Sequence, residues 1–463
     1  MASPSRWPDL ASFALGLADA DVPDEARRKA VDAMTDALAC ALAGSVSEVA
    51  LPILRALGIG PGSAAGGAAL LGAGRTAAPA DAALYNGTIT HALDYDDVTH
   101  PAYSHPSTVL MPALFALAAE ARSTGRDIVT AYIVGLEIFG KLGRALNTTH
   151  YRAGWHATST FGSIAAAIAA ARLLKLTPAQ LSSAIGMAAS ASSGLRANFG
   201  TMTKPLHAGY AARNAVLAVK LAREGFTASA EALTHRFGFA QTFNAGRAIR
   251  WEEFRNWGEP FEILSEFGIG LKPFPSCAAT HTGIEAALLL RQEIGGAIDR
   301  IRSIRAGVAE MSLEPLIHVK PSTLLEGKFS MHYCIASALM DGQVDLSTFT
   351  EAKLARPQIA DLIGRTQMEV DDRVRHSGEF ASVVSFTLDD GSRREKLVEL
   401  AMGKPQRWFS HERLRQKFME CGAGILPAER LDDAFAAAQS LDRLPNIDSL
   451  LGHLSIAKAA AAE

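Results

Sequence analysis

The chain has 463 residues and carries 45 Lys and Arg against 48 Asp and Glu, a net charge of −3 that excludes the overall basic character of a nucleic-acid-binding protein. Hydrophobic residues make up 48% and charged residues 20%, which excludes global disorder and supplies a large buried core. At roughly 150 residues per domain, the length predicts two to three domains. Aromatic residues make up only 7% while alanine is frequent, which favours packed helices over a β-sandwich.

The cysteine pattern and the length of the apolar runs exclude further classes of protein. Four cysteines are too few and too widely spaced for a disulfide framework or a paired CxxC zinc site: Cys40, Cys277, Cys334 and Cys421. The most apolar stretches, 110–121 and 164–171, are shorter than the roughly 18 residues of a membrane span. Residues 1–17 contain no signal-peptide core. We therefore expect a cytoplasmic, helix-rich protein of enzyme size, with neither a membrane nor a nucleic acid as partner.

The first half of the chain predicts one helix after another. Pro23 is typical of a helix start and Gly44 of its end, with apolar residues at helical spacing between them. Thr177 and Gln180 form a capping box, and Pro178 takes the first helical position. Further helices are expected at 81–91, 107–121 (capped by Ser107 or Thr108), 127–144, 164–174 and 207–223.

After about residue 265 the pattern becomes mixed. Short strands are predicted at 301–308 and 367–370, and a hairpin at 383–388 and 396–400, turning at Asp389-Asp390-Gly391. Helices are expected at 283–292 and 329–340, and again from Ser410 onward. The fold class is therefore mostly α: a large all-helical domain formed by both chain ends, 1–266 and 405–463, with an inserted α+β domain at 267–404.

The densest polar cluster lies between two predicted helices. Residues 91–106 read HALDYDDVTHPAYSHP and include His91, Asp94, Asp96, Asp97, His100 and His105. Histidine titrates near neutral pH and a neighbouring Asp can orient it, as proton-transfer chemistry requires. The alternative is a loop in which Asp caps helices and His is solvated. A metal site is disfavoured because no HExxH or similar spacing is present.

Two further segments place polar side chains at helix starts. His156, in GWHATS, directly precedes a predicted helix, where free N–H groups favour an anionic substrate. Lys204 and His207 flank the start of the next helix in a segment with few other charges. A Lys in such a setting binds a carboxylate or, with a lowered pKa, acts as an acid or base. The alternatives are a buried His bonded to backbone and a Lys that reaches solvent.

The start of the inserted domain, KPFPSCAATH, carries Lys272, Cys277 and His281. Cys277 and His281 are four residues apart and share a face if the segment is helical, so a Cys–His nucleophile pair is conceivable. A small packed residue is the more ordinary interpretation of Cys277. Lys272 and His281 are typical of the same polar, substrate-binding set.

Other catalytic motifs are weak or missing. Residues 72–77, GAGRTA, fit GxGxxA, and Asp94 lies near the distance of a ribose-binding acid. The surrounding chain is predicted to be helical without a βαβ alternation, which argues against a dinucleotide-binding fold. The sequence contains neither GxxxxGK[ST] nor GxSxG, which argues against a P-loop NTPase and an α/β-hydrolase.

These segments, in this order, resemble the MmgE/PrpD family, which includes 2-methylcitrate dehydratase, cis-aconitate decarboxylase and iminodisuccinate epimerase. The resemblance runs over nearly the whole chain. Its motifs are HALDYDDVTHPAYSHPS (91–107), GWHATSTFG (154–162), TMTKPLHAGYAARN (201–214), KPFPSCAATHTGIEA (272–286) and GKFSMHYCIASAL (327–339). The resemblance implies a helical domain with a smaller α+β lid domain, a homodimer, and no metal, iron–sulfur cluster or nucleotide cofactor.

The resemblance also implies site residues. By motif match the catalytic candidates are Asp94, His105, His156, Lys204 and His281, and the substrate-binding candidates are Lys272, His207 and Cys277. We expect His105 or His156 to act as general base or acid, with Asp94 orienting a neighbouring His. Lys204, Lys272 and His281 are expected to bind carboxylates or the leaving group.

The family's reactions share chemistry at the carbon α to a carboxylate of a small di- or tricarboxylate. The resemblance favours a dehydratase or hydratase, with an epimerase of an iminodisuccinate-like compound or a decarboxylase of a cis-aconitate-like acid as alternatives. Val98 in place of Thr, and one additional residue before His105, distinguish this loop from that of decarboxylase members. A non-catalytic binding protein is disfavoured, because a pure binder needs no set of acid and base groups.

Overall fold

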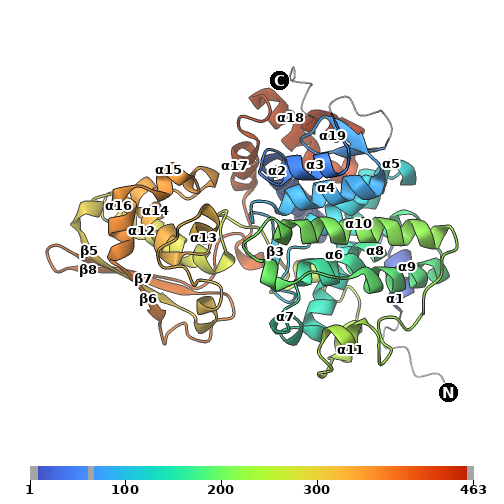
Figure 1. The fold of residues 1–463 in the computed structure, drawn as a ribbon, viewed down its shortest axis with the longest axis horizontal. Coiled ribbons are helices and arrows are strands. Elements are labelled where there is room, and N and C mark those ends of the chain that lie inside the picture. The colour runs from blue at the N-terminus through green and yellow to red at the C-terminus, as the bar shows by residue number, and fades with distance from the viewer. Residues whose placement is uncertain (1–8, 61–66, 456–463) are drawn as a thin grey trace. The chain divides into compact units, whose positions relative to one another are not determined.

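The computed structural model describes residues 9–60 and 67–455, which divide into two compact units. One unit comprises the residues up to Leu271 together with those from Ser410 onward, and the other comprises Lys272–Phe409. The smaller unit thus begins at 272 rather than 267 and ends at 409 rather than 404. The mostly α fold with a smaller α+β part is confirmed (Figure 1).

The larger unit is built from helices around an alanine-rich centre. Its N-terminal helices are α1 (Leu10–Gly16), α2 (Asp24–Ser45), α3 (Ala50–Ala56), α4 (Pro79–His91), α5 (Ser107–Ala121), α6 (Gly125–Leu146), α7 (Thr149–Arg152), α8 (Ala157–Leu173), α9 (Pro178–Ala191), α10 (Thr203–Arg223) and α11 (Phe239–Phe243). Helix α8 is buried along nearly its whole length and packs against α5, α6, α9 and α10. Its small side chains let these neighbours approach closely from all sides.

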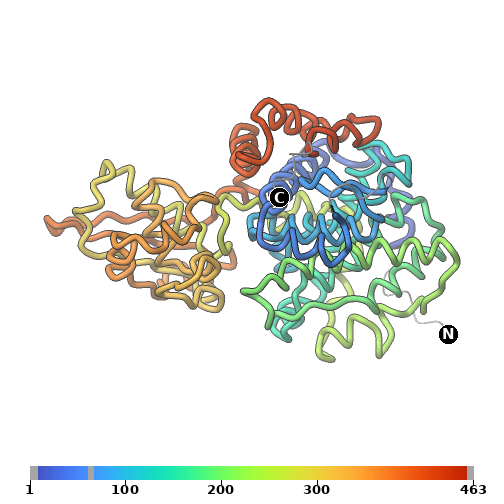
Figure 2. Tube along the Cα trace, turned by 45° about the horizontal axis from the view of Figure 1, so that its top comes forward, coloured from blue at the N-terminus to red at the C-terminus, as the bar shows by residue number. Residues whose placement is uncertain are grey.

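The C-terminal segment returns to this unit. It forms α17 (His411–Gly422), α18 (Ala428–Gln439) and α19 (Asp448–Leu454), and both α17 and α18 pack against α2 (Figure 2). The Ser410 hydroxyl accepts a hydrogen bond from the Arg413 N–H and so caps α17. One core is therefore completed by chain segments from the two ends of the sequence.

Most of the predicted helices are present with shifted ends. The capping box of Thr177 and Gln180 is confirmed, and Thr124 caps α6 in the same way. The expected cap of α5 is wrong: Pro106 takes the N-cap position, and Ser107 is the first helical residue. The Ser107 hydroxyl donates instead to Asp97, because that buried carboxyl group needs a partner.

Two short antiparallel ladders interrupt the helices of the larger unit. Strands β1 (Ala68–Leu70) and β2 (Arg75–Ala77) form a hairpin that contains the GxGxxA segment. No parallel strand or crossover helix accompanies it in the described part of this unit, in agreement with the exclusion of a dinucleotide-binding fold. Strand β3 (Val98–Thr99) pairs with β4 (Ile269–Gly270).

The smaller unit is a four-stranded sheet with helices on one face. The sheet order is β6 (Thr366–Val370), β5 (Ile301–Val308), β7 (Ser382–Leu388) and β8 (Arg393–Val398); β5 and β6 are parallel and the other pairs antiparallel. The helices are α12 (His281–Glu293), α13 (Leu324–Lys328), α14 (Met331–Asp341), α15 (Glu351–Leu354) and α16 (Pro357–Gly364). Every second residue of β5 points to the same face of the sheet. Ile304, Ala306 and Val308 point inward, and this face packs against α12 and α14.

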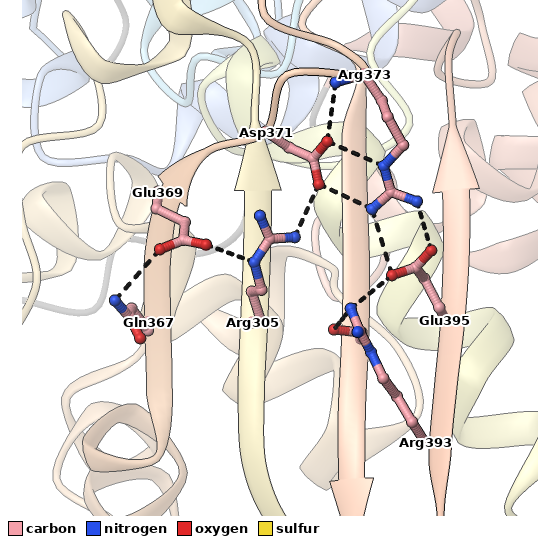
Figure 3. Close-up of polar contacts among 8 residues, drawn as sticks. Arg305, Gln367, Glu369, Asp371, Arg373, Arg393 and Glu395 are labelled. Carbon is pink, nitrogen blue, oxygen red and sulfur yellow. Dashed lines mark hydrogen bonds and ion pairs between the residues drawn. The ribbon is translucent and has the colours of Figure 1, made fainter.

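The opposite face of this sheet carries a network of ion pairs that crosses three strands and the loop after β6 (Figure 3). Arg305 on β5 contacts Glu369 at 2.5 Å and Asp371 at 2.8 Å. Arg373 joins Asp371 to Glu395 on β8. Asp371 is buried, but its partners are partly exposed, so the network orders the polar face more than it stabilises the fold.

No single helix among the described residues is long and apolar enough to cross a membrane. Within 9–60 and 67–455, one pair of helices, α2 and α3, meets the length and composition of a span when taken together, and the two are bent by 79° at the break between them.

Helices α4 and α10 are in close contact, and their ends carry polar residues of the sequence motifs: His91 on α4, and Lys204 and His207 on α10. Gly87 and Gly209 face each other across this contact: a Cβ on Gly87 would lie 3.0 Å from Gly209 Cα. A Cβ on Gly209 would lie 2.2 Å from Thr88 Oγ1 and 2.3 Å from the Leu84 carbonyl oxygen. Glycine at both positions is what permits this close approach.

We predict that Gly209→Ala lowers the free energy of unfolding by about 1–3 kcal/mol, because the added methyl group must push α10 away from α4. Urea unfolding followed by circular dichroism measures the change. Gly452→Ala is the control, because nothing lies within 4 Å of a Cβ there; it should be neutral or stabilise by about 0.5–1 kcal/mol. Equal stability of the two variants would contradict a tight α4–α10 contact.

Candidate active site

The polar motif at 91–106 forms a folded-back loop between α4 and α5. Helix α4 ends at His91, and Asp94 takes a left-handed backbone conformation with φ 54°. Thr99 and Ser104 then pair, with the Thr99 N–H donating to the Ser104 carbonyl at 2.8 Å. This turn brings His105 back over His91, so that their ring centroids are 4.4 Å apart.

Asp96 lies between these two histidines and is fully buried. Its carboxylate is 2.9 Å from His91 Nδ1 and 3.1 Å from His105 Nδ1. Burial alone would raise the pKa of Asp96, but attraction and hydrogen bonding by His91 and His105 outweigh burial and hold its pKa well below the usual value. Asp96 is therefore ionised at neutral pH and orients both imidazoles.

His91 has the features of a general base. Its Nδ1–H donates to Asp96, which leaves the lone pair on Nε2. That Nε2 atom is buried and has no hydrogen-bond partner among residues 9–60 and 67–455. Burial lowers the pKa of His91 to about 4, against the opposing charge of Asp96. A carboxylate that fixes the tautomer of a neutral imidazole is the arrangement of an acid–base dyad.

Asp94 pairs mainly with a lysine rather than with a histidine. Lys204, in the first turn of α10, places Nζ 2.7 Å from Asp94 Oδ1, and both side chains are about nine-tenths buried. His105 Nε2 is 3.7 Å from the same carboxylate oxygen. Burial opposes the charge on Lys204, but Asp94 outweighs burial and raises the pKa of the lysine above its usual value. Lys204 is therefore a fixed cation, not a base.

A second histidine pair lies beside the first. His156, at the N-cap of α8, and His207, in the first turns of α10, face each other with their Nδ1 atoms 3.1 Å apart. The ring of His156 stacks on that of His91 with centroids 5.8 Å apart. Two neutral imidazoles joined through Nδ1 must be opposite tautomers, because one Nδ1 donates and the other accepts. One ring then has a free lone pair on Nε2 and the other carries an Nε2–H.

Both members of this pair stay neutral at physiological pH. Burial lowers the pKa of His156 well below its usual value, and the neighbouring His91 and Lys204 act in the same direction. Burial likewise lowers the pKa of His207 to about 4. The cluster thus supplies a proton acceptor and a proton donor next to the Lys204 cation.

The predicted site residues of the larger unit, Asp94, His105, His156, Lys204 and His207, therefore lie in one cluster. Sequence reasoning did not select His91 and Asp96, although both stood in the quoted motif. Their five-residue separation spans a helix end, which no periodic pattern reveals. Asp97 of the same motif has a different role: it accepts from the Ser107 hydroxyl, and burial raises its pKa well above the usual value.

The cluster includes a set of groups with metal-ligating chemistry. One ligand atom each from His91, Asp94, Asp96 and His105 lies within 4.8 Å of the others. A divalent ion held by all four would come close to the Lys204 ammonium, which is 2.7 Å from Asp94 Oδ1 and repels it. The donor set fits a metal in type, but Lys204 already supplies the compensating charge.

The remaining predicted residues belong to the smaller unit. Lys272 is buried at its first residue, and Cys277 is half-buried before a short 3₁₀ turn. His281 begins α12, with Nε2 3.1 Å from the Ser276 carbonyl oxygen. Because Cys277 precedes the helix that His281 starts, the two do not share a face of one helix, and the Cys–His interpretation gains no support.

Buried, neutral histidines oriented by a carboxylate next to a lysine cation characterise an acid–base catalytic centre for an anionic substrate. Comparison with known proteins identifies the family. Residues 8–252 match the MmgE/PrpD N-terminal domain, and residues 274–442 match the MmgE/PrpD C-terminal domain. The chain belongs to the MmgE/PrpD family.

Several relatives are named as enzymes. Cis-aconitate decarboxylase of Aspergillus terreus (strain NIH 2624 / FGSC A1156) is 28% identical over 466 residues, which cover 96% of this chain and 94% of that protein. Cis-aconitate decarboxylase of Homo sapiens is 27% identical over 398 residues, which cover 80% and 78%. The mouse enzyme of the same name is similar to the same extent. The roles of the individual site residues in this chain stay predictions.

The pH dependence of activity tests the neutral state of these histidines. If His156, His207 or His91 acts as a base, activity is lost as pH falls through its pKa, because protonation removes the lone pair. Burial lowers the pKa values of His91 and His207 to about 4, so the acid limb of kcat/KM is expected well below the ordinary value of 6.5. Rates measured from pH 4 to 8 check this, and an acid limb near 6.5 would contradict a buried, neutral base.

Proposed function

We propose that this protein is a lyase that acts at the carbon α to a carboxylate of a small di- or tricarboxylate, as a dehydratase or hydratase. The observation that supports this most directly is the His156–His207 pair, whose Nδ1 atoms are 3.1 Å apart. Loss of water needs a base for the proton and an acid for the departing hydroxyl, and this pair offers one of each. Lys204 adds the cation that an anionic substrate requires.

In this proposal the base removes the proton α to a carboxylate, and the negative charge that develops is stabilised by Lys204. The hydroxyl on the neighbouring carbon then leaves with a proton from the acid, so that the products are an unsaturated acid and water. His91 is the alternative base, since Asp96 fixes its tautomer and its Nε2 is unpaired among the described residues. Lys272, His281 and Cys277 of the smaller unit keep the carboxylate-binding role that their motif predicts, as a proposal.

A decarboxylase is the second candidate, and the relatives favour it. The A. terreus and human proteins named above are cis-aconitate decarboxylases. Loss of carbon dioxide leaves a carbanion, which the same acid can protonate and the same cation can stabilise. An epimerase needs the same base with an acid on the other face of the carbon.

We predict that His156→Ala lowers kcat by about 10²–10⁴-fold, because it removes one partner of the acid–base pair. Turnover is followed by proton NMR in deuterium oxide with 2-methylcitrate, citrate and cis-aconitate. Each assay is run with and without EDTA, because Lys204 rather than a metal is expected to supply the positive charge. An unchanged circular dichroism spectrum is the control for folding.

The products distinguish the alternatives. Interconversion of a hydroxy acid with its unsaturated acid supports the dehydratase. Loss of carbon dioxide from cis-aconitate supports the decarboxylase, and deuterium exchange without either loss supports an epimerase. Inhibition by EDTA, or a near-wild-type rate of His156→Ala, contradicts the proposed chemistry, and no exchange with any acid favours a binding protein.

We also propose that the protein forms a homodimer through the outer face of α10. Tyr210, Leu217 and Leu221 are each more than one third exposed. They are separated by seven and four residues, which places them on one face of the helix. Leu217 and Leu221 lie one turn apart, and the polar residues Arg213 and Asn214 separate them from Tyr210 on the same face. Apolar side chains exposed beside polar ones are found at protein interfaces, and the proposed occupant is a second copy of the chain.

The double variant Leu217→Glu/Leu221→Glu is expected to sediment as a monomer in analytical ultracentrifugation, because two carboxylates would be buried at the interface. The control is Leu51→Glu, an exposed leucine on α3 outside this stripe, which should leave the dimer intact. A dimeric double variant would place the interface elsewhere, and a monomeric wild type would contradict the proposal.

A further inference from the structure

A buried lysine outside the family-resembling motifs contacts the backbone of the candidate site. Lys417 lies on α17 in the C-terminal segment and is fully buried. Its ammonium group is 2.7 Å from Asp36 Oδ1 on α2, and it donates a hydrogen bond of 2.7 Å to the carbonyl oxygen of Tyr95. The same nitrogen lies 3.8 Å from the centroid of the Tyr95 ring, which is also buried.

We propose that Lys417 is a positioning residue for the candidate active site, acting through the acidic turn, residues 94–97. Tyr95 is the residue between the two carboxylates of the cluster. Asp94 on one side pairs with Lys204, and Asp96 on the other side holds His91 and His105. Lys417 therefore holds the Tyr95 carbonyl group, which lies in the backbone between Asp94 and Asp96.

The conformation of the acidic turn gives this anchor its importance. Asp94 has a φ of 54°, a left-handed conformation that is uncommon outside glycine but more frequent for Asp than for most residues, and the contacts around Asp94 keep it there. The Asp94 side chain is held by Lys204, and the peptide between Tyr95 and Asp96 is held by Lys417. Asp97 is held separately by Ser107, so Lys417 acts on the segment between Asp94 and Asp96, and without it we expect the spacing of these two carboxylates to change. Displacements of about 1 Å in such groups cost up to about 10²-fold in rate.

If Lys417 had only a structural role, its replacement would change stability but not the geometry of the acidic turn. Lys417 and Asp36 join α17 to α2, so their ion pair contributes to the packing of the C-terminal segment. Removing one partner of a buried pair leaves an uncompensated charge and is strongly destabilising. Removing both, with apolar replacements, relieves that cost. Stability and positioning can therefore be separated by the choice of variant.

The experiment compares Lys417→Met, Asp36→Asn and the double variant Asp36→Leu/Lys417→Met. Asp36→Asn breaks the ion pair but keeps the hydrogen bond to Tyr95, whereas the two variants that carry Lys417→Met lose this hydrogen bond. Arg172→Met is the matched control: Arg172 also donates to two backbone carbonyls, those of Ala14 and Leu17, at the end of α8 remote from His156. The readouts are the melting temperature, kcat and KM, and the amide hydrogen exchange of residues 94–97.

We expect the double variant to recover the melting temperature that Lys417→Met loses, yet to keep a kcat about 10²-fold below wild type. Its acidic turn should exchange faster than in wild type, while the rest of α2 and α17 does not. Asp36→Asn and Arg172→Met should retain kcat even where they lower the melting temperature. Recovery of both stability and kcat in the double variant would overturn the proposal, as would an equal loss of kcat in Asp36→Asn.

The kinetic part rests on the proposed function, whereas the exchange measurement does not. If the wild-type protein turns over none of the acids, the proposed function fails. Faster exchange of the acidic turn in the stable double variant would still support the anchoring role of Lys417. Unchanged exchange there would refute that role regardless of activity.

Discussion

The ion pair between Lys204 and Asp94 is the interaction on which the candidate site depends. A buried ammonium group is stable only with a partner of opposite charge, and Asp94 supplies it at 2.7 Å. This pair connects α10 to the loop after α4, and so it sets the distance between the two histidine pairs. Asp94 raises the pKa of Lys204 against the effect of burial, whereas burial and the nearby Lys204 charge both lower the pKa values of His156 and His207.

The Lys204–Asp94 pair in turn requires the close contact of α4 and α10. Gly87 and Gly209 let the backbones of these helices approach, and the ends of the same helices carry His91, Lys204 and His207. Small residues in a helix contact thus serve the geometry of the site as well as the packing of the core. The alanine-rich α8 contributes in the same way, because it carries His156 at its N-cap and lies buried among its neighbours.

Local signals in the sequence predicted most of the helices and most of the residues of the candidate site. Periodicity and capping residues indicated the helices, the strand 301–308 has the predicted bounds, and the polar motifs contained nearly every member of the cluster. The pairing within the cluster was not predictable, because it depends on the backbone turn at Asp94 and on contacts between distant helices. Asp96, rather than Asp94, orients the histidines for this reason. Lys417 was not predicted, because a lysine in the charged segment 411–422 is expected at the surface. Its burial depends on the packing of α17 against α2.

The connection of Lys417 to Tyr95 spans 322 residues of sequence, and this has a consequence for biosynthesis. At about 5–20 residues per second, roughly 20–60 s of translation separate the two groups. During that interval the emerging helical unit contains Asp36 without its counterion. Burial raises the pKa of Asp36 to about 6 even with the lysine in place. The α+β unit is encoded by one continuous stretch of sequence. We therefore expect it to complete its fold on the ribosome before the N-terminal helices, which are synthesised earlier, pack around the Asp36 carboxylate.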